Sequence, residues 1–224
     1  MRDPPYLAHG PGAREGPLLL VVEGANDEAF LRTLSGILSA SDAALPNLSE
    51  LADSGDLVFI PFGGGSPLSW ATRLASLRCP EFHLFDRELP PESAWRQIAA
   101  ARVNARPGCQ AWVTTPRSLE NYLHPAAMVH ATSGACVVDF GPDDCVATVV
   151  ARDLQQRRGP RDWSDLSRFQ RSKLVQKTKR WLNTTAVRHM TSELLEASDP
   201  HGDIVHWLKT IQAMLPAPRS VLIT

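Results

Sequence analysis

The stretch LLLVVEGANDEAFL, residues 18–31, decides how the chain folds. Its first five residues are all apolar, and Leu18–Val22 has the length and composition of a short buried strand. From Asp27 to Leu38 the apolar side chains recur three and four positions apart, which is typical of an amphipathic helix. Two acids, Glu23 and Asp27, stand where the strand gives way to the helix. A buried strand that leads straight into a helix is the opening unit of an α/β fold.

The same alternation of short apolar runs and helical patterns continues through the first half of the chain. Ser66 and Pro67 are residue types that favour the N-cap and first position of a helix. Parallel strands that are covered on both faces form short, almost continuous apolar runs. The sequence therefore predicts an α/β fold with a mostly parallel sheet and helices on both faces. Further strands are expected at Leu57–Phe62, Phe82–Phe85 and Gln110–Val113, and a further helix at Glu92–Val103.

Three segments are expected along the chain. Residues 1–16, rich in Pro and Gly, form a loose N-terminal arm. Residues 17–123 form the α/β core, and residues 124–224 form a mainly helical C-terminal extension that packs on the core. Within the extension, Cys136–Phe140 is a candidate edge strand and Asp203–Leu215 is the last helix.

The bulk composition argues against several classes of protein. The 224-residue chain has 23 basic and 24 acidic residues, so no overall positive charge points to nucleic acid. No apolar run approaches the roughly 20 residues that span a bilayer, and the N-terminus lacks a signal-peptide pattern. The four cysteines show neither CxxC pairing nor a histidine at zinc-finger spacing, so we expect neither a zinc site nor a disulfide framework. These features predict a cytoplasmic protein that does not bind membranes.

Positive charge is concentrated in one segment of the chain. Residues 157–180 contain nine basic and two acidic residues, a net charge of +7, which leaves −8 for the rest. Lys173, Lys177 and Arg180 recur on one face of a predicted helix in this segment, beside an apolar stripe. Such a strip can bind the phosphates of a nucleic-acid backbone, although a charge run is often only a solvated helix face.

Carboxylates follow two of the expected strands. Glu23 comes directly after the first strand, and Asp86 and Glu88, in HLFDREL, come directly after the third. Ligands of open parallel sheets bind beyond the carboxyl ends of the strands, and Asp27 projects back toward Glu23 by its i, i+4 spacing. Carboxylates brought together repel one another unless a cation neutralises them or some of them are protonated, and oxygen-only ligands favour Mg²⁺ or Mn²⁺. The alternative is that the acids merely favour the helix dipole or flank Arg87 in a surface ion pair.

These motifs carry a resemblance to a known family. EGxxD after an apolar strand, followed about sixty residues later by an acidic pair after another strand, resembles a Toprim domain. This is the catalytic module of type IA and II topoisomerases, bacterial primases and several nucleases; here DRE at 86–88 stands where those domains have DxD. The segment TTPRSLENYLHP, with Ser118 and Glu120, resembles the one that follows the core in OLD-family nucleases. The resemblance is good from Leu18 to Tyr122 and loose over the later helices.

The resemblance implies a Rossmann-like Toprim fold with a site for two Mg²⁺ or Mn²⁺ ions. The ligands it implies are Glu23 and Asp27 for one ion, Asp86 shared or nearby, and Glu88, Ser118 and Glu120 for the second ion. Glu23 is also expected to act in catalysis, as is Lys173, which matches a family lysine, although Lys177 or Lys179 would serve after a small shift. Ser118 has an alternative role as the N-cap of a helix that begins at the next residue. Phosphate contacts are expected from Arg87, Arg117, Lys177 and Arg180.

The motifs that are missing narrow the choice within the family. The chain lacks GxxxxGK[ST], and its GGGS at 63–66 has no phosphate-binding lysine, so no ATP site is expected. OLD nucleases carry an ATPase domain ahead of this module, so any ATP dependence would come from a separate ATPase partner. A topoisomerase would need an attacking tyrosine on another domain, and a primase would need a zinc module.

The sequence thus predicts a metal-dependent endonuclease that hydrolyses nucleic acid, preferably DNA, by a two-metal Toprim mechanism. Family analogy adds a role in phage defence and a homodimer. One alternative is a Toprim scaffold that binds nucleic acid or an ATPase partner and cuts only in that complex. The other is a phosphoryl-transfer enzyme for small phosphate esters, for which the basic strip would have no use.

Overall fold

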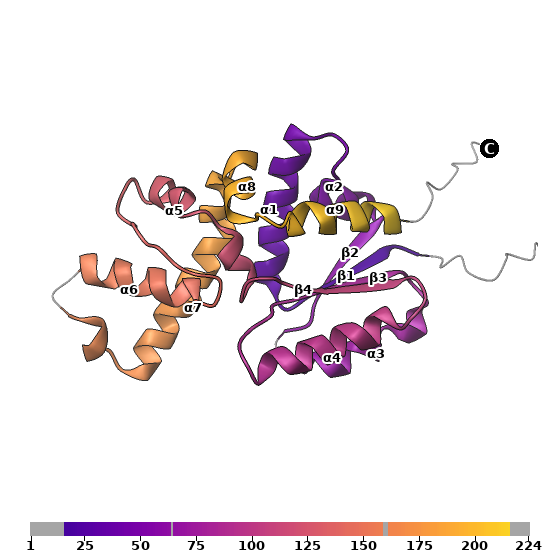
Figure 1. Cartoon of the computed structure of the whole chain (residues 1–224), viewed down its shortest axis with the longest axis horizontal. Coiled ribbons are helices and arrows are strands. Elements are labelled where there is room, and N and C mark those ends of the chain that lie inside the picture. Colours follow the sequence, from indigo (N-terminus) through magenta and orange to yellow (C-terminus); the bar gives the residue numbers. More distant parts are fainter. Residues whose placement is uncertain (1–15, 64, 159–160, 216–224) are drawn as a thin grey trace, which may run out of the picture.

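A four-stranded parallel sheet in the order β2-β1-β3-β4 forms the centre of the protein (Figure 1). The computed structural model describes residues 16–63, 65–158 and 161–215, so the expected N-terminal arm lies almost wholly outside the described residues. The strands are β1 (Leu18–Val22), β2 (Leu57–Pro61), β3 (Glu81–Phe85) and β4 (Cys109–Val113). Each agrees with its predicted range to within one residue at either end. The predicted parallel α/β sheet is therefore confirmed.

The two central strands explain why the sequence has apolar runs rather than an alternating pattern. Every residue of β1 and of β3 is buried. Successive side chains of a strand point to opposite faces of the sheet. Leu20 and Val22 accordingly belong to one hydrophobic core, and Val21 between them belongs to the other. Both faces of the sheet are thus covered, as a parallel sheet requires.

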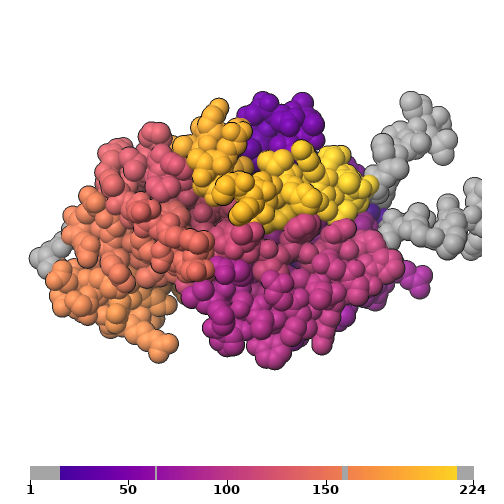
Figure 2. Space-filling model, viewed as in Figure 1, coloured from indigo at the N-terminus to yellow at the C-terminus, as the bar shows by residue number. Residues whose placement is uncertain are grey.

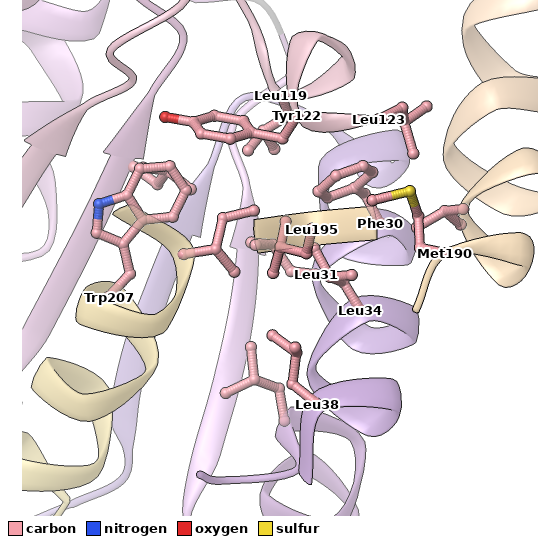
Figure 3. Close-up of a cluster of buried hydrophobic side chains, with 14 of the residues drawn as sticks. Phe30, Leu31, Leu34, Leu38, Leu119, Tyr122, Leu123, Met190, Leu195 and Trp207 are labelled. Atoms are coloured by element: carbon pink, nitrogen blue, oxygen red, sulfur yellow. The ribbon is translucent and has the colours of Figure 1, made fainter. Parts of the chain in front are cut away.

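Helices cover the two faces of the sheet in two groups (Figure 1). They are α1 (Ala25–Ser41), α2 (Leu48–Ser54) and α9 (Asp203–Met214) on one face, and α3 (Pro67–Arg73) and α4 (Glu92–Asn104) on the other. The core under α1 and α9 is the larger, and Figure 3 shows Phe30 and Leu34 of α1 meeting Tyr122 and Trp207 there. Helix α2 is absent from the sequence prediction; Asn47 caps its first turn, and Gly55 ends it with a left-handed φ of 80°.

The C-terminal extension is helical, as predicted. Besides α9, it contains α5 (Pro125–Ala131), α6 (Val146–Arg158), α7 (Arg168–Thr184) and α8 (Ser192–Ser198), with short 3-10 helices η3 (Trp163–Asp165) and η4 (Ala186–His189). Two further 3-10 helices, η1 (Ala75–Leu77) and η2 (Leu119–Tyr122), lie in the core segment. Figure 2 shows residues of the α6–α7 region forming one end of the molecule, beside the sheet domain. Within the described ranges, no helix is both long and apolar enough to cross a membrane.

The expected edge strand at Cys136–Phe140 is wrong, because this segment is an irregular connection. Its backbone N–H groups find partners outside a sheet. The Cys136 N–H donates to Oγ1 of Thr132, and the Phe140 N–H donates to Oδ1 of Asp139. Side chains that bond to nearby backbone groups compete in this way with strand pairing.

Candidate active site

Two carboxylates lie at the carboxyl ends of neighbouring strands. Glu23 follows β1 and Asp86 follows β3, and these strands are paired in parallel with Val21 opposite His83. The Leu119 backbone N–H donates to Asp86 Oδ1 at 2.9 Å, which fixes this buried carboxylate against η2. The edge of the sheet predicted to hold the ligand is therefore the edge where these acids lie.

Asp27 reaches the same edge from the first turn of α1. Its Oδ2 accepts a hydrogen bond from the Gly24 backbone N–H at 2.9 Å, so the side chain folds back over the end of β1. Asp27 is only 3% exposed. Burial raises the pKa of Asp27 to about 6, with Lys179 opposing this rise and the charges of Glu120 and Glu23 adding to it.

Glu120 completes the buried set of acids from η2. It is 3% exposed, and its Oε1 accepts a hydrogen bond from Nδ2 of Asn183 in α7 at 2.6 Å. Its charge, together with burial, raises the pKa of Asp86 well above the ordinary value for aspartate. The four acids Glu23, Asp27, Asp86 and Glu120 thus share one electrostatic environment.

Lys179 of α7 provides the positive charge inside this cluster. Its Nζ lies 3.7 Å from Asp86 Oδ2 and 3.5 Å from Glu120 Oε1. Burial opposes the charged form of this lysine, but the carboxylates around it outweigh that effect and raise the pKa of Lys179 above its usual range. Lys179 therefore stays protonated and links α7 to both β3 and η2.

Lys173, the lysine expected from the resemblance, does not take this position. It is exposed on α7, as are Lys177 and Arg180. Lys173 lies six positions before Lys179, which is about 9 Å along a helix axis. The physical reason is the orientation of α7, which turns Thr178, Leu182 and Asn183 toward the protein. The structure thus corrects the identity of the lysine at the acids to Lys179.

Glu23 has a cationic partner that the sequence analysis missed. Arg96 of α4 donates from Nε to Glu23 Oε1 at 3.0 Å and from Nη2 to Oε2 at 3.3 Å. Such a forked arginine–carboxylate pair is geometrically specific and charge-assisted. Both side chains are mostly buried, 13% and 20% exposed. No local signal marks Arg96, because its meeting with Glu23 depends on how α4 packs beneath the sheet.

Glu88 stands apart from the other acids. It has a left-handed φ of 54°, and its N–H donates to the carbonyl of Arg117 at 2.9 Å. The loop after β3 is further held by the Arg87 N–H, which donates to Oγ1 of Thr114. These bonds direct the Glu88 side chain to Arg117, whose Nε lies 3.0 Å from Glu88 Oε2. Glu88 is not among the charges that shift the pKa of Asp27 or of Asp86.

Arg87 and Arg117, two of the three arginines expected to contact phosphate, are both engaged by acids. Arg117 pairs with Glu88, and Arg87 pairs with the exposed Asp143. The surface ion pair considered for Arg87 in the sequence therefore exists, but with a residue more than fifty positions away. Exposed pairs of this kind are weak and yield to a better partner.

Ser118 acts as a helix cap in this structure. It is the N-cap of η2, within a capping box that Asn121 completes, and its Oγ donates to Asn121 Oδ1 at 2.9 Å. Asn121 in turn donates to the backbone carbonyls of Gly141 and Asp144. The capping role raised from the sequence is thus present, and it holds Glu120 in place through the short helix that follows.

A hard divalent cation matches the chemistry of these donors, which are all carboxylate oxygens. Among the described residues, however, no group of three or more His, Cys, Asp or Glu side chains is arranged so that it could hold a metal ion. Lys179 lies between Asp86 and Glu120, and Arg96 holds both oxygens of Glu23. The cations of the chain itself thus occupy the carboxylates that a metal would need.

Comparison of the chain with protein-family models, with curated proteins and with solved structures found no match.

Proposed function

We propose that the protein is a divalent-metal-dependent endonuclease of the Toprim type, resembling the nuclease module of OLD-family enzymes. One observation carries the proposal: acids that follow β1 and β3 meet acids of α1 and η2 at the carboxyl edge of the sheet, around the half-buried Lys179. Buried acids with strongly perturbed pKa values at the ligand-binding edge of a sheet are typical of functional sites.

In the described arrangement these acids are not set to hold a metal ion; once Lys179 leaves Asp86 and Glu120, the residues that would hold Mg²⁺ or Mn²⁺ are Asp27, Asp86 and Glu120, joined by Glu23 when Arg96 releases it. A bound divalent ion would supply an activated water and neutralise charge on the phosphoryl oxygens. Lys179 can donate from Nζ to a phosphate oxygen and stabilise the charge that develops there. Its charge also lowers the pKa values of Asp27 and Asp86, which opposes the larger effect of burial.

The outer face of α7 provides the contact to the substrate. Lys173, Lys177 and Arg180 are exposed there, one helix side away from Lys179. Backbone phosphates bind such cations without regard to sequence, and each neutralised phosphate adds to the salt dependence of binding. A nucleic-acid strand that crosses α7 from this face toward Lys179 would bring its backbone to the acids. DNA is the preferred substrate in this proposal.

Incubation of the purified protein with supercoiled plasmid and Mn²⁺ or Mg²⁺ tests this function. Nicking or linearisation is expected, and it should disappear in Glu23→Gln and in Lys179→Met. Lys209→Met, which alters an exposed lysine of α9, is the matched control and should cut normally. Retention of cutting in Glu23→Gln would refute the assignment, and hydrolysis of mononucleotides without any cutting of polymers would select a small-ester enzyme.

A second candidate is a site of the same kind that cuts only in a complex with nucleic acid or with an ATPase partner. The observation in its favour is that Glu23, Glu88 and the Asp86–Glu120 pair each hold a cation of the chain. Those contacts would have to open before a metal could bind. Tight binding of DNA without cleavage under any metal would select this candidate.

A further inference from the structure

A cavity of about 430 Å³ lies between α5, α6 and α7, outside the acid cluster. This volume falls within the range of pockets that hold small molecules, about 300–1,000 Å³. Thr178 and Trp181 of α7 line it, whereas Lys179 and Asn183 of the same helix contact the acids. At about 100° per residue these two pairs lie on opposite sides of α7. The helix therefore separates the cavity from the proposed catalytic site.

The walls of the cavity are apolar, with one aromatic ring. Leu154 of α6 and Leu174 and Trp181 of α7 contribute the large side chains. Trp181 is only partly buried, so its ring is available to a ligand. Nucleobases bind to aromatic rings of this kind by stacking, whatever their sequence.

The polar groups of the cavity favour an anion. Its lining contains no acidic residue but two basic ones, Arg157 and Lys177. Arg157 is held by both carboxylate oxygens of Asp153, whereas Lys177 has no ion pair with any residue that the structure describes. The surrounding segment, residues 157–180, carries a net charge of +7. Lys177 is therefore the residue that would meet the anionic end of a ligand.

Gln155 adds a group that can recognise the edge of a base. Its Nε2 donates to the carbonyl of Arg161, which fixes the amide and leaves Oε1 as an acceptor. The Thr178 side chain adds a hydroxyl on the opposite wall. A ring platform, one fixed amide and one unpaired cation together match a nucleobase that carries a phosphate.

We propose that this cavity binds a nucleotide unit, with its base against Trp181 and its phosphate at Lys177. The choice of a nucleotide rests on the proposed function, because a nuclease of this kind meets such units. The unit is either the 5′-phosphorylated end of a nucleic-acid strand or a free mononucleotide. Both have the same chemistry at the cavity.

Calorimetric titration of the full chain with 5′-dAMP tests the proposal. The Glu23→Gln protein in EDTA is used, so that binding is measured without metal or cleavage and a failure of the nuclease proposal does not affect it. Saturable binding to one site is expected, with deoxyadenosine and inorganic phosphate each binding at least about tenfold more weakly. Lys177→Met should weaken binding of 5′-dAMP by about tenfold or more, whereas Lys209→Met should leave it unchanged.

A cavity-blocking variant tests the location independently of charge. Ala135→Phe fills the mouth of the cavity at an exposed position, and Ala101→Phe at an exposed position of α4 is its control. Only Ala135→Phe should abolish binding. Competition by an oligonucleotide with a 5′-phosphate, but not by the same strand without it, would identify a strand end as the natural source; its failure would identify the mononucleotide. Absent binding, equal binding of deoxyadenosine, or binding unchanged by Lys177→Met and Ala135→Phe would overturn the proposal.

Discussion

Replacing Asp27 by asparagine removes a negative charge that destabilises the folded protein. Burial raises the pKa of Asp27 from its ordinary 3.8 to about 6; the charge of Lys179 opposes this rise, and repulsion from Glu120 and Glu23 adds to it. Between these two pH values the folded state keeps a proton that the unfolded state has released. Stability contributed by this group is therefore present below pH 4 and is lost as the pH rises through 6.

The size of the effect follows from the two pKa values. A difference of about two units corresponds to about 3 kcal/mol once the folded-state carboxyl is ionised. Asparagine has nearly the same shape, and its Oδ1 can still accept the hydrogen bond from the Gly24 N–H. We expect Asp27→Asn to be more stable than the parent by about 2–3 kcal/mol at pH 8 and about equal to it at pH 4.

Denaturation at pH 8 and at pH 4, in the absence of divalent ions, measures this difference. For a chain of this length, 3 kcal/mol corresponds to a shift of roughly 6–12 °C in Tm. Asp53→Asn, at an exposed position of α2, is the control and should show no pH-dependent difference. A destabilised Asp27→Asn protein at pH 8, or an equal difference at both pH values, would refute the reasoning. Asp27→Asn should also abolish cleavage, because the carboxylate charge that destabilises the folded protein is the charge that a bound metal ion requires.

Three further predictions concern Lys179, Arg96 and Glu81, a buried acid at the start of β3. Lys179→Met should abolish plasmid cleavage and lower the free energy of unfolding by about 1–3 kcal/mol, less than for a fully buried pair because the lysine is partly exposed. Lys173→Met should leave stability unchanged and reduce cleavage only through weaker binding of DNA, and equal effects of the two variants would contradict the placement. Arg96→Gln should strengthen Mn²⁺ binding, seen as a larger Mn²⁺-induced rise in Tm, because it frees Glu23; a smaller rise would show that Arg96 only supports the fold. Burial opposes the ionisation of Glu81, but hydrogen bonds from His83 and Arg106 lower its pKa to about 2. Glu81→Gln should therefore lower the free energy of unfolding by about 3–5 kcal/mol at pH 7, and by less as the pH falls from 4 toward 2. Urea denaturation measures that loss, and a change below about 1 kcal/mol would contradict the ion pairing.

The sheet could be predicted from the sequence because burial on both faces leaves a local record. Leu18–Val22 is apolar along its whole length, and in the strand before Asp86 the residues Phe82, Leu84 and Phe85 are apolar; a run of this kind is typical of a strand that is buried on both faces. Strand order leaves no such record, because it depends on contacts between distant segments. The approach of Glu23 to Asp86 was inferred only from the rule that parallel strands end at the same edge, and pairing of β1 with β3 makes that approach close.

The identity of the lysine was harder to infer, although part of the signal was present. Lys179 has Val175 four residues before it and Leu182 and Asn183 three and four residues after it, so it shares a helix side with residues packed on the protein. Lys173 lacks this pattern and is exposed. The spacing in the family pointed to Lys173, whereas the periodicity of the helix would have pointed to Lys179, the lysine that lies at the acids.

The site contains more negative than positive charge. Its four carboxylates face only Lys179 and Arg96, and the raised pKa values of Asp27 and Asp86 show how the folded chain responds. Protonation and a divalent ion are two ways of supplying the same missing positive charge, so they compete for the same oxygens. A metal that binds here must release protons, and its affinity should rise between pH 5 and pH 8. Metal binding that did not depend on pH would place the ion somewhere other than on these acids.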